Sequence, residues 1–112
     1  MSAEIDLLKF EQLSGRLTWL PAVAAAFLQQ LPKWRLDFAT ALATHNLVDQ
    51  LELLHKIKGS CYAVAAYNTI KVISQAEEAH ALGLPLAPLE LLHQLERVEA
   101  ELRTIVVNAP PQ

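Results

Sequence analysis

The chain has 112 residues, of which 53% are hydrophobic and only three are glycine, and its net charge is −3. This length suits one domain with a single core, and the hydrophobic share excludes a disordered chain. The acidic balance and the lack of a basic stripe argue against binding to nucleic acid. Since Ala and Leu are abundant, helices are favoured over strands, and we expect an all-α domain.

The N-terminal stretch "MSAEIDLLKF" has no basic segment followed by an apolar one, so no signal peptide is expected. The longest apolar run, "WLPAVAAAFL", covers residues 19–28 and is about half of the roughly 20 residues that a spanning helix needs. The single cysteine, Cys61, can form neither a disulfide framework nor a thiolate cluster. We expect a soluble, cytoplasmic protein without membrane insertion.

The first predicted element is a short amphipathic helix over residues 4–13. Ile5, Leu8 and Leu13 lie on one side of it, and Gly15 ends it. Because the segment is short, we expect it to be an accessory to the main helices.

Two further helices are predicted on either side of Pro32. The first covers residues 18–31, with Thr18 as the N-cap and Pro21 in the first turn, where a missing N–H is tolerated. Pro32 is then expected to open a separate helix over residues 33–44.

The centre of the chain predicts two more helices. Asn46 is expected to cap a helix that continues to Ala66, and Asn68 a helix that ends near residue 82. Gly83 then occupies the C-terminal cap position of the second of these helices.

A last helix is predicted over residues 88–107, followed by an unstructured tail over residues 108–112. Its apolar stripe consists of Leu91, Leu95, Val98, Leu102 and Ile105. Short connections favour antiparallel neighbours. Residues 1–107 are therefore expected to form an antiparallel four-helix bundle with one or two short accessory N-terminal helices.

The central helix carries an unusual polar stretch, "HKIKGS", over residues 55–60. The inward face is expected to consist of Leu47, Leu54, Ile57, Cys61 and Val64, which recur at spacings of three and four. This face leaves His55 on the solvent side, with Lys58 and Gly59 one turn further along. A glycine inside a helix costs about 1 kcal/mol relative to alanine, which suggests a use for this position.

This combination has a chemical use. An exposed imidazole is largely neutral at pH 7 and can act as a nucleophile, and an ammonium group one turn away can neutralise a phosphoryl group carried on it. A neighbouring glycine lets another protein approach closely. The plain alternative is that these residues belong to a solvated helix face without a function, as most His–Lys pairs on helix surfaces do. The coincidence of His55, Lys58 and Gly59 favours a functional site.

The stretch resembles the His-x-x-Lys-Gly motif of histidine phosphotransfer (HPt) domains, which act in multistep phosphorelays and hybrid sensor kinases. The match is most specific over residues 55–60, and a weaker apolar pattern extends over residues 16–106. The family fold is a four-helix bundle with accessory helices. The resemblance implies a phosphocarrier that exchanges a phosphoryl group with the Asp of response-regulator receiver domains in a two-component system.

The resemblance also assigns roles to residues. His55 would be the phosphoacceptor, Lys58 would stabilise the phosphohistidine, and Gly59 would give the partner access. A Gln or Glu on the next helix often lies near the site in this family, and Gln75 or Glu77 could take that place. The partner is expected to contact a rim around His55 consisting of Val48, Leu51, Glu52, Tyr62 and Ala66.

The resemblance further implies that the chain holds no cofactor or metal, and that the receiver supplies the Mg²⁺ for transfer. The chain has no Gly-rich phosphate cradle, so neither ATP binding nor enzyme activity of its own is expected. Two positions depart from the family pattern. Ala65 replaces a common second glycine, where we expect helix packing to survive, and Tyr62 replaces a small residue.

Two other functions remain as alternatives: a helical adaptor that binds a partner without phosphorylation, and a di-metal carboxylate bundle. Glu-x-x-His occurs three times, at Glu52–His55, Glu77–His80 and Glu90–His93, and paired motifs of this kind bind two irons in helical bundles. Such a site also needs inward glutamates on two other helices, and residues 16–46 contain none. His45, His80 and His93 are therefore expected to be ordinary surface or boundary residues.

Overall fold

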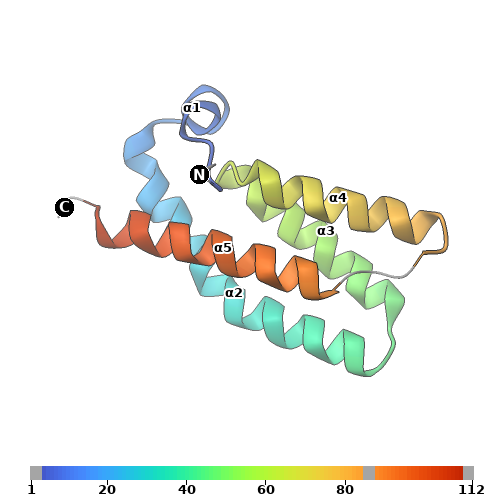
Figure 1. Ribbon diagram of the computed structural model, residues 1–112. Coiled ribbons are helices and arrows are strands. Elements are labelled where there is room, and N and C mark those ends of the chain that lie inside the picture. Colours follow the sequence, from blue (N-terminus) through green and yellow to red (C-terminus); the bar gives the residue numbers. More distant parts are fainter. Residues whose placement is uncertain (1–3, 85–87, 110–112) are drawn as a thin grey trace.

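The computed structural model describes residues 4–84 and 88–109, and these residues contain helices and turns but no strand. The long helices are α2 (Leu20–Ala43), α3 (Leu47–Ala63), α4 (Tyr67–Ala81) and α5 (Pro88–Val107). α2 and α4 each pack against both α3 and α5 (Figure 1). The described part of the chain is thus an all-helical bundle, and none of its helices is long and apolar enough to span a bilayer.

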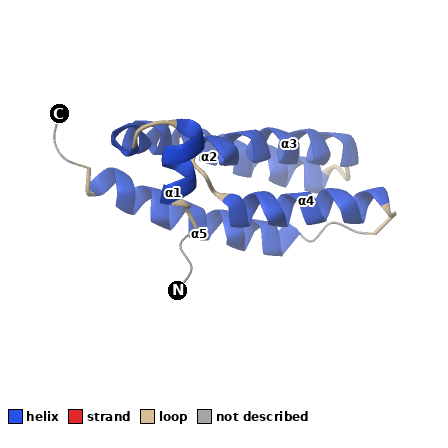
Figure 2. Cartoon of the chain, turned by 90° about the horizontal axis from the view of Figure 1, so that it is seen from above, coloured by secondary structure: helices blue, strands red, loops and turns tan. Residues whose placement is uncertain are grey.

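The N-terminal segment consists of short helical pieces beside this bundle (Figure 2). They are α1 (Leu7–Lys9), a π-helical stretch (Phe10–Ser14) and a 3₁₀ turn (Leu17–Trp19). Ile5 and Phe10 are its buried anchors. Leu8 and Leu13, expected on the buried side, are 64% and 72% exposed. The prediction of that face was wrong because the segment is not one regular helix.

α2 is a single helix that continues through Pro32, so the prediction of two helices was wrong. A proline inside a helix removes one backbone hydrogen bond and crowds the preceding turn. Here the ring is exposed, and the helix on both sides of it buries one continuous stripe: Leu20, Ala24, Phe27, Leu31, Trp34, Phe38 and Ala41. Burial of that stripe outweighs the local cost. Thr18 lies in the preceding 3₁₀ turn and is not the N-cap, which is Trp19.

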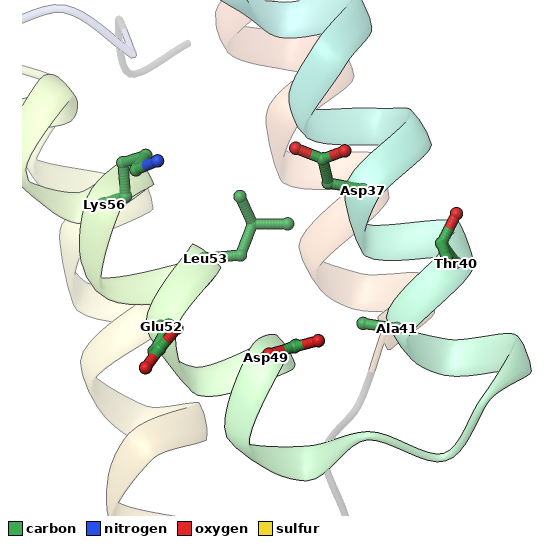
Figure 3. Close-up of a pocket in the computed structure, with 7 residues that line it drawn as sticks. All are labelled: Asp37, Thr40, Ala41, Asp49, Glu52, Leu53 and Lys56. Atoms are coloured by element: carbon green, nitrogen blue, oxygen red, sulfur yellow. The ribbon is translucent and has the colours of Figure 1, made fainter.

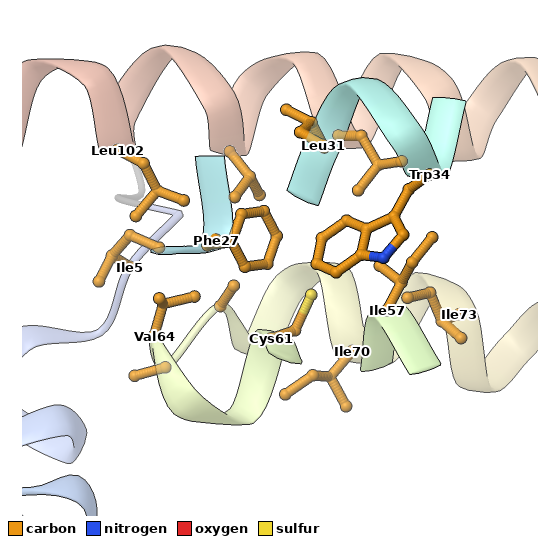
Figure 4. Packing of buried hydrophobic residues seen from close by; sticks show 14 of the residues in the cluster. Ile5, Phe27, Leu31, Trp34, Ile57, Cys61, Val64, Ile70, Ile73 and Leu102 are labelled. Carbon is orange, nitrogen blue, oxygen red and sulfur yellow. The ribbon is translucent and has the colours of Figure 1, made fainter. Parts of the chain in front are cut away.

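The core lies between the four long helices (Figure 4). The rings of Phe27 and Trp34 meet edge to face with their centroids 5.1 Å apart, a favourable arrangement of their quadrupoles. Around them pack side chains from every long helix and from the N-terminal segment, including Ile5, Ile57, Cys61, Val64, Ile70, Ile73 and Leu102. The predicted stripe of α5 is confirmed, with four of its residues buried and Ile105 partly buried.

Three helices end in the same hydrogen-bond pattern, the Schellman motif. After α4, the N–H groups of Gly83 and Leu84 bond to the carbonyls of His80 and Ala79 at 2.9 and 2.8 Å. Gly83 has a φ of 78° there, as predicted for the cap position. The residues in the equivalent positions after α2 and α3 are not glycines.

α3 ends at Ala63, before the predicted Ala66. Ala65 adopts a φ of 57°, and the N–H groups of Ala65 and Ala66 bond to the carbonyls of Tyr62 and Cys61. Ala65 thus lies in a turn and not in a helix, contrary to the expectation for this position. Ala66 is the N-cap of α4 in place of the predicted Asn68.

Candidate functional site

α3 is oriented by its cap and by its buried face. The Asn46 side chain accepts a hydrogen bond from the Asp49 N–H at 3.0 Å, which confirms the predicted N-cap. The helix buries Gln50, Leu53, Leu54, Ile57 and Cys61 against the bundle. Leu47, which was expected to point inward, is 50% exposed because it lies in the first turn at the end of the bundle. The buried face leaves the opposite side of α3 in solvent.

His55, Lys58 and Gly59 lie together on that free side. His55 and Gly59 are exposed and Lys58 is half-buried, and residues three and four apart are neighbours on a helix surface. A Cβ added to Gly59 would meet no atom within 4 Å. The glycine therefore leaves an open space on the surface beside the imidazole, and nothing in the fold requires it.

Lys58 is tied to α4. Its Nζ lies 2.6 Å from Oε1 of Glu77, and their side chains are 21% and 28% exposed. Sequence reasoning placed Glu77 or Gln75 near the site, and it is Glu77 that contacts Lys58, while Gln75 is exposed. The pairing itself was not predicted, because the rotation of α4 against α3 depends on packing that no short motif encodes.

The rim around His55 is mostly accessible. Val48 is 66% and Tyr62 50% exposed; Glu52 is exposed and Leu51 half-buried. Ala66 is fully buried in the α3–α4 turn, so it was wrongly included in the rim and cannot contact a partner through its side chain. Val48, Leu51 and Tyr62 therefore contribute apolar area to this face, beside the charge of Glu52.

Tyr62 continues the surface toward the N-terminal segment. Its ring meets that of Tyr67 edge to face, with centroids 6.1 Å apart, and Nζ of Lys9 lies 4.6 Å from the centroid of the Tyr67 ring. Cation–π contact at this distance is favourable. Sequence reasoning missed Tyr67 and Lys9, since only the fold brings residue 9 beside α4.

A groove between α2 and α3 opens next to this surface (Figure 3). Its lining consists of Asp37, Thr40, Ala41, Asp49, Glu52, Leu53 and Lys56. Three of these seven residues are acidic and one is basic, and His55 does not belong to the lining. The imidazole therefore stands on an open helix face outside this groove.

Other nucleophilic and metal-ligating groups are placed differently. Cys61 is fully buried, and burial raises the pKa of its thiol to about 12, so it cannot act with His55 as a nucleophilic pair. His45 and His93 are exposed and His80 is half-buried, as predicted. Over residues 4–84 and 88–109, no group of three or more His, Cys, Asp or Glu side chains is arranged to hold a metal ion.

Comparisons of the chain with protein-family models, with curated proteins and with solved structures find no match. Any functional assignment therefore depends on the residues of this chain. The feature that distinguishes its surface is the exposed imidazole of His55, with a cation and an open glycine one turn away on the same helix face.

Proposed function

We propose that this chain is a histidine phosphotransfer domain, a phosphocarrier in a two-component phosphorelay. The observation that carries the proposal is the surface of α3, where His55 is exposed beside Lys58 and an open Gly59. Its partners would be response-regulator receiver domains and a hybrid sensor kinase, and its location cytoplasmic. The packing of α2 to α5 is compatible with the antiparallel four-helix bundle of this family, with the N-terminal segment as the accessory part.

The proposed reaction moves one phosphoryl group between two proteins. The neutral ring nitrogen of His55 attacks the phosphorus of an acyl phosphate on the receiver's Asp. An N–P bond forms, the P–O bond to the carboxylate breaks, and the carboxylate leaves as the anion. The reverse reaction delivers the group to a second receiver. Mg²⁺ held by the receiver would offset charge in the loose transition state.

The chain's own residues contribute position and charge. The packed face of α3 fixes the orientation of the helix that carries His55, which favours a defined angle of approach. Lys58 supplies a cation within one turn, and its half-buried stem limits where its ammonium can go. The open surface at Gly59 lets the rim of a receiver come close. No ATP is needed, so the chain would be a transfer intermediate and not a kinase.

An open site suits this reaction better than chemistry on a small molecule. Small substrates are usually enclosed in clefts that bury most of their surface, whereas His55 stands on a convex helix face. A group delivered by another protein needs no pocket, because the partner covers the site during transfer. The exposed Val48 and Tyr62 would then be buried by the partner.

A transfer assay tests the proposal against the alternative of a non-phosphorylated adaptor. The chain is mixed with each ³²P-phosphorylated receiver domain of the source organism, and the products are separated on Phos-tag gels. We expect acid-labile, base-stable label to move to the chain within seconds to minutes from at least one receiver. An adaptor would bind a partner without becoming labelled, and this result with every receiver would refute the phosphocarrier function.

A further inference from the structure

Glu77 forms an ion pair with Lys58, the residue whose ammonium group would stabilise a phosphoryl group on His55. Lys58 Nζ and Glu77 Oε1 are 2.6 Å apart, a short, charge-assisted contact. Lys58 follows His55 by three residues, so their Cβ atoms are about 5–6 Å apart on the helix surface. The resting site therefore contains one cation that already has an anionic partner.

We propose that Glu77 competes with the phosphoryl group on His55 for Lys58. This competition would set the lifetime of the phosphohistidine and the position of the transfer equilibrium with a receiver. This inference deepens the proposed function and rests on it. Glu77 acts through Lys58, so it is a positioning residue. A carrier benefits from such an opponent, because a phosphohistidine that is too stable would not pass its group onward.

The sign of the effect follows from charge in either of two geometries. If the ammonium turns fully to the phosphoryl oxygens, it gives up the contact with Glu77, and that loss opposes phosphorylation. If it bridges both groups with its three donors, the phosphoryl group and the Glu77 carboxylate lie on the same cation and repel each other. In both cases the Glu77 charge destabilises phosphohistidine, and removing that charge stabilises it.

Glu77→Gln is the matching substitution, since it keeps the shape and removes the charge. Glu78→Gln is the control, because Glu78 is the neighbouring residue on α4 and is exposed. Both are made in a chain in which His55 is the only histidine, through His45→Asn, His80→Gln and His93→Gln. Asparagine suits position 45, where φ is 53°. Circular dichroism and thermal melting check that each variant folds.

The first measurement needs no partner. His55 is phosphorylated chemically with phosphoramidate, and the lifetime of the phosphohistidine is followed by ³¹P NMR. We expect Glu77→Gln to lengthen the lifetime about two- to fivefold, the size expected for one competing charge near the surface. Glu78→Gln should leave it unchanged. In a Lys58→Gln background, Glu77→Gln should have little further effect, because the contested cation is absent.

The second measurement is the transfer equilibrium with a receiver, and it separates the two proposals. Glu77→Gln should shift that equilibrium toward phospho-His55 by a similar factor. An unchanged or shortened lifetime in Glu77→Gln, or the same lengthening in the Lys58→Gln background, overturns the competition, even if transfer from receivers is observed. If phosphoramidate labels His55 and no receiver does, the proposed function fails, while the lifetimes still decide whether Glu77 opposes phosphorylation.

Discussion

The second half of α3 and the turn that follows it differ in where a glycine and an alanine stand. Gly59 lies within the helix, where the backbone needs no glycine and an added Cβ would meet only open space. Ala65 lies in the following turn with a φ of 57°, a conformation that favours glycine, and it is fully buried. Gly59 therefore occupies a position where the backbone does not require glycine, whereas Ala65 occupies one where the backbone conformation favours glycine.

The fold explains why Ala65 is tolerated. Its carbonyl accepts a hydrogen bond from the Asp6 N–H at 2.9 Å, and its own N–H bonds to the Tyr62 carbonyl. The turn is thus fixed by contacts on both sides and by burial. No comparable structural reason exists for Gly59. The comparison teaches that the fold accounts for Ala65 but gives no reason for Gly59, for which the proposed approach of a partner would supply one.

Among the variants that test this comparison, Gly59→Gln is expected to have the largest effect on transfer. The fold should gain stability, by about 1 kcal/mol, because glycine is a poor helix former and the site is open. Transfer from a receiver should fall about 30- to 150-fold, since forcing extra atoms into a packed contact costs about 2–3 kcal/mol. Denaturant unfolding and single-turnover transfer measure the two effects.

Gly59→Ala is the matched control for that variant, because it supplies the helix propensity with one added methyl group. It should gain a similar free energy of unfolding and lose much less transfer activity. If Gly59→Gln is more stable and transfers at the normal rate, access to this surface is not why position 59 is a glycine.

A smaller effect is expected from Tyr62→Ala, in the last turn of α3 between the two compared positions. The ring is half exposed and rests on Tyr67, so truncation should remove about 0.5–1.5 kcal/mol of stability. As an aromatic anchor on a docking surface, its loss should slow transfer from the cognate receiver about 5- to 30-fold, which corresponds to 1–2 kcal/mol. Rates should change unequally among receivers.

Leu89→Ala on α5 is the control for Tyr62→Ala, because Leu89 is also a large exposed side chain, 65% accessible, and lies on another helix. It should change no transfer rate. If Tyr62→Ala slows transfer from every receiver equally and also loses much stability, Tyr62 is a packing residue without a role in partner choice.

The smallest effect is expected from Ala65→Gly. Relief of the left-handed conformation gains about 1–2 kcal/mol, while added backbone freedom costs about 0.5–1 kcal/mol and the lost buried methyl about 0.8 kcal/mol. The free energy of unfolding should therefore stay within about 1 kcal/mol of the original chain, as measured by urea unfolding. A loss above 2 kcal/mol would show that methyl packing, and not backbone strain, dominates this turn.

The same turn shows where the sequence could and could not predict the fold. Gly83 marked the end of α4 because glycine is the usual residue at that position of a Schellman motif. Ala65 and His45 occupy the equivalent positions after α3 and α2 with φ values of 57° and 53°, and neither residue signals a turn. The end of α3 was therefore placed too late, within an apolar stretch that reads as continuing helix.

Pro32 shows the opposite error, since a strong local signal was overridden by packing. The stripe that includes Leu31 and Trp34 is buried on both sides of the proline, and no local rule weighs that burial against one lost hydrogen bond. The exposure of His55 could be predicted because it follows from the apolar periodicity of one helix. The contacts between Lys58 and Glu77, and between Lys9 and Tyr67, join different elements and needed the fold.

The most direct test of the central claim, that His55 is the sole phosphoacceptor, is the labelling of His55→Gln by a phosphorylated receiver that labels the original chain. His55 is exposed, and its side chain is not part of the core, so helix content and melting temperature should be retained. The account predicts that labelling of His55→Gln is abolished, while a chain without His45, His80 and His93 is labelled normally. Substantial acid-labile, base-stable phosphate on folded His55→Gln would contradict it.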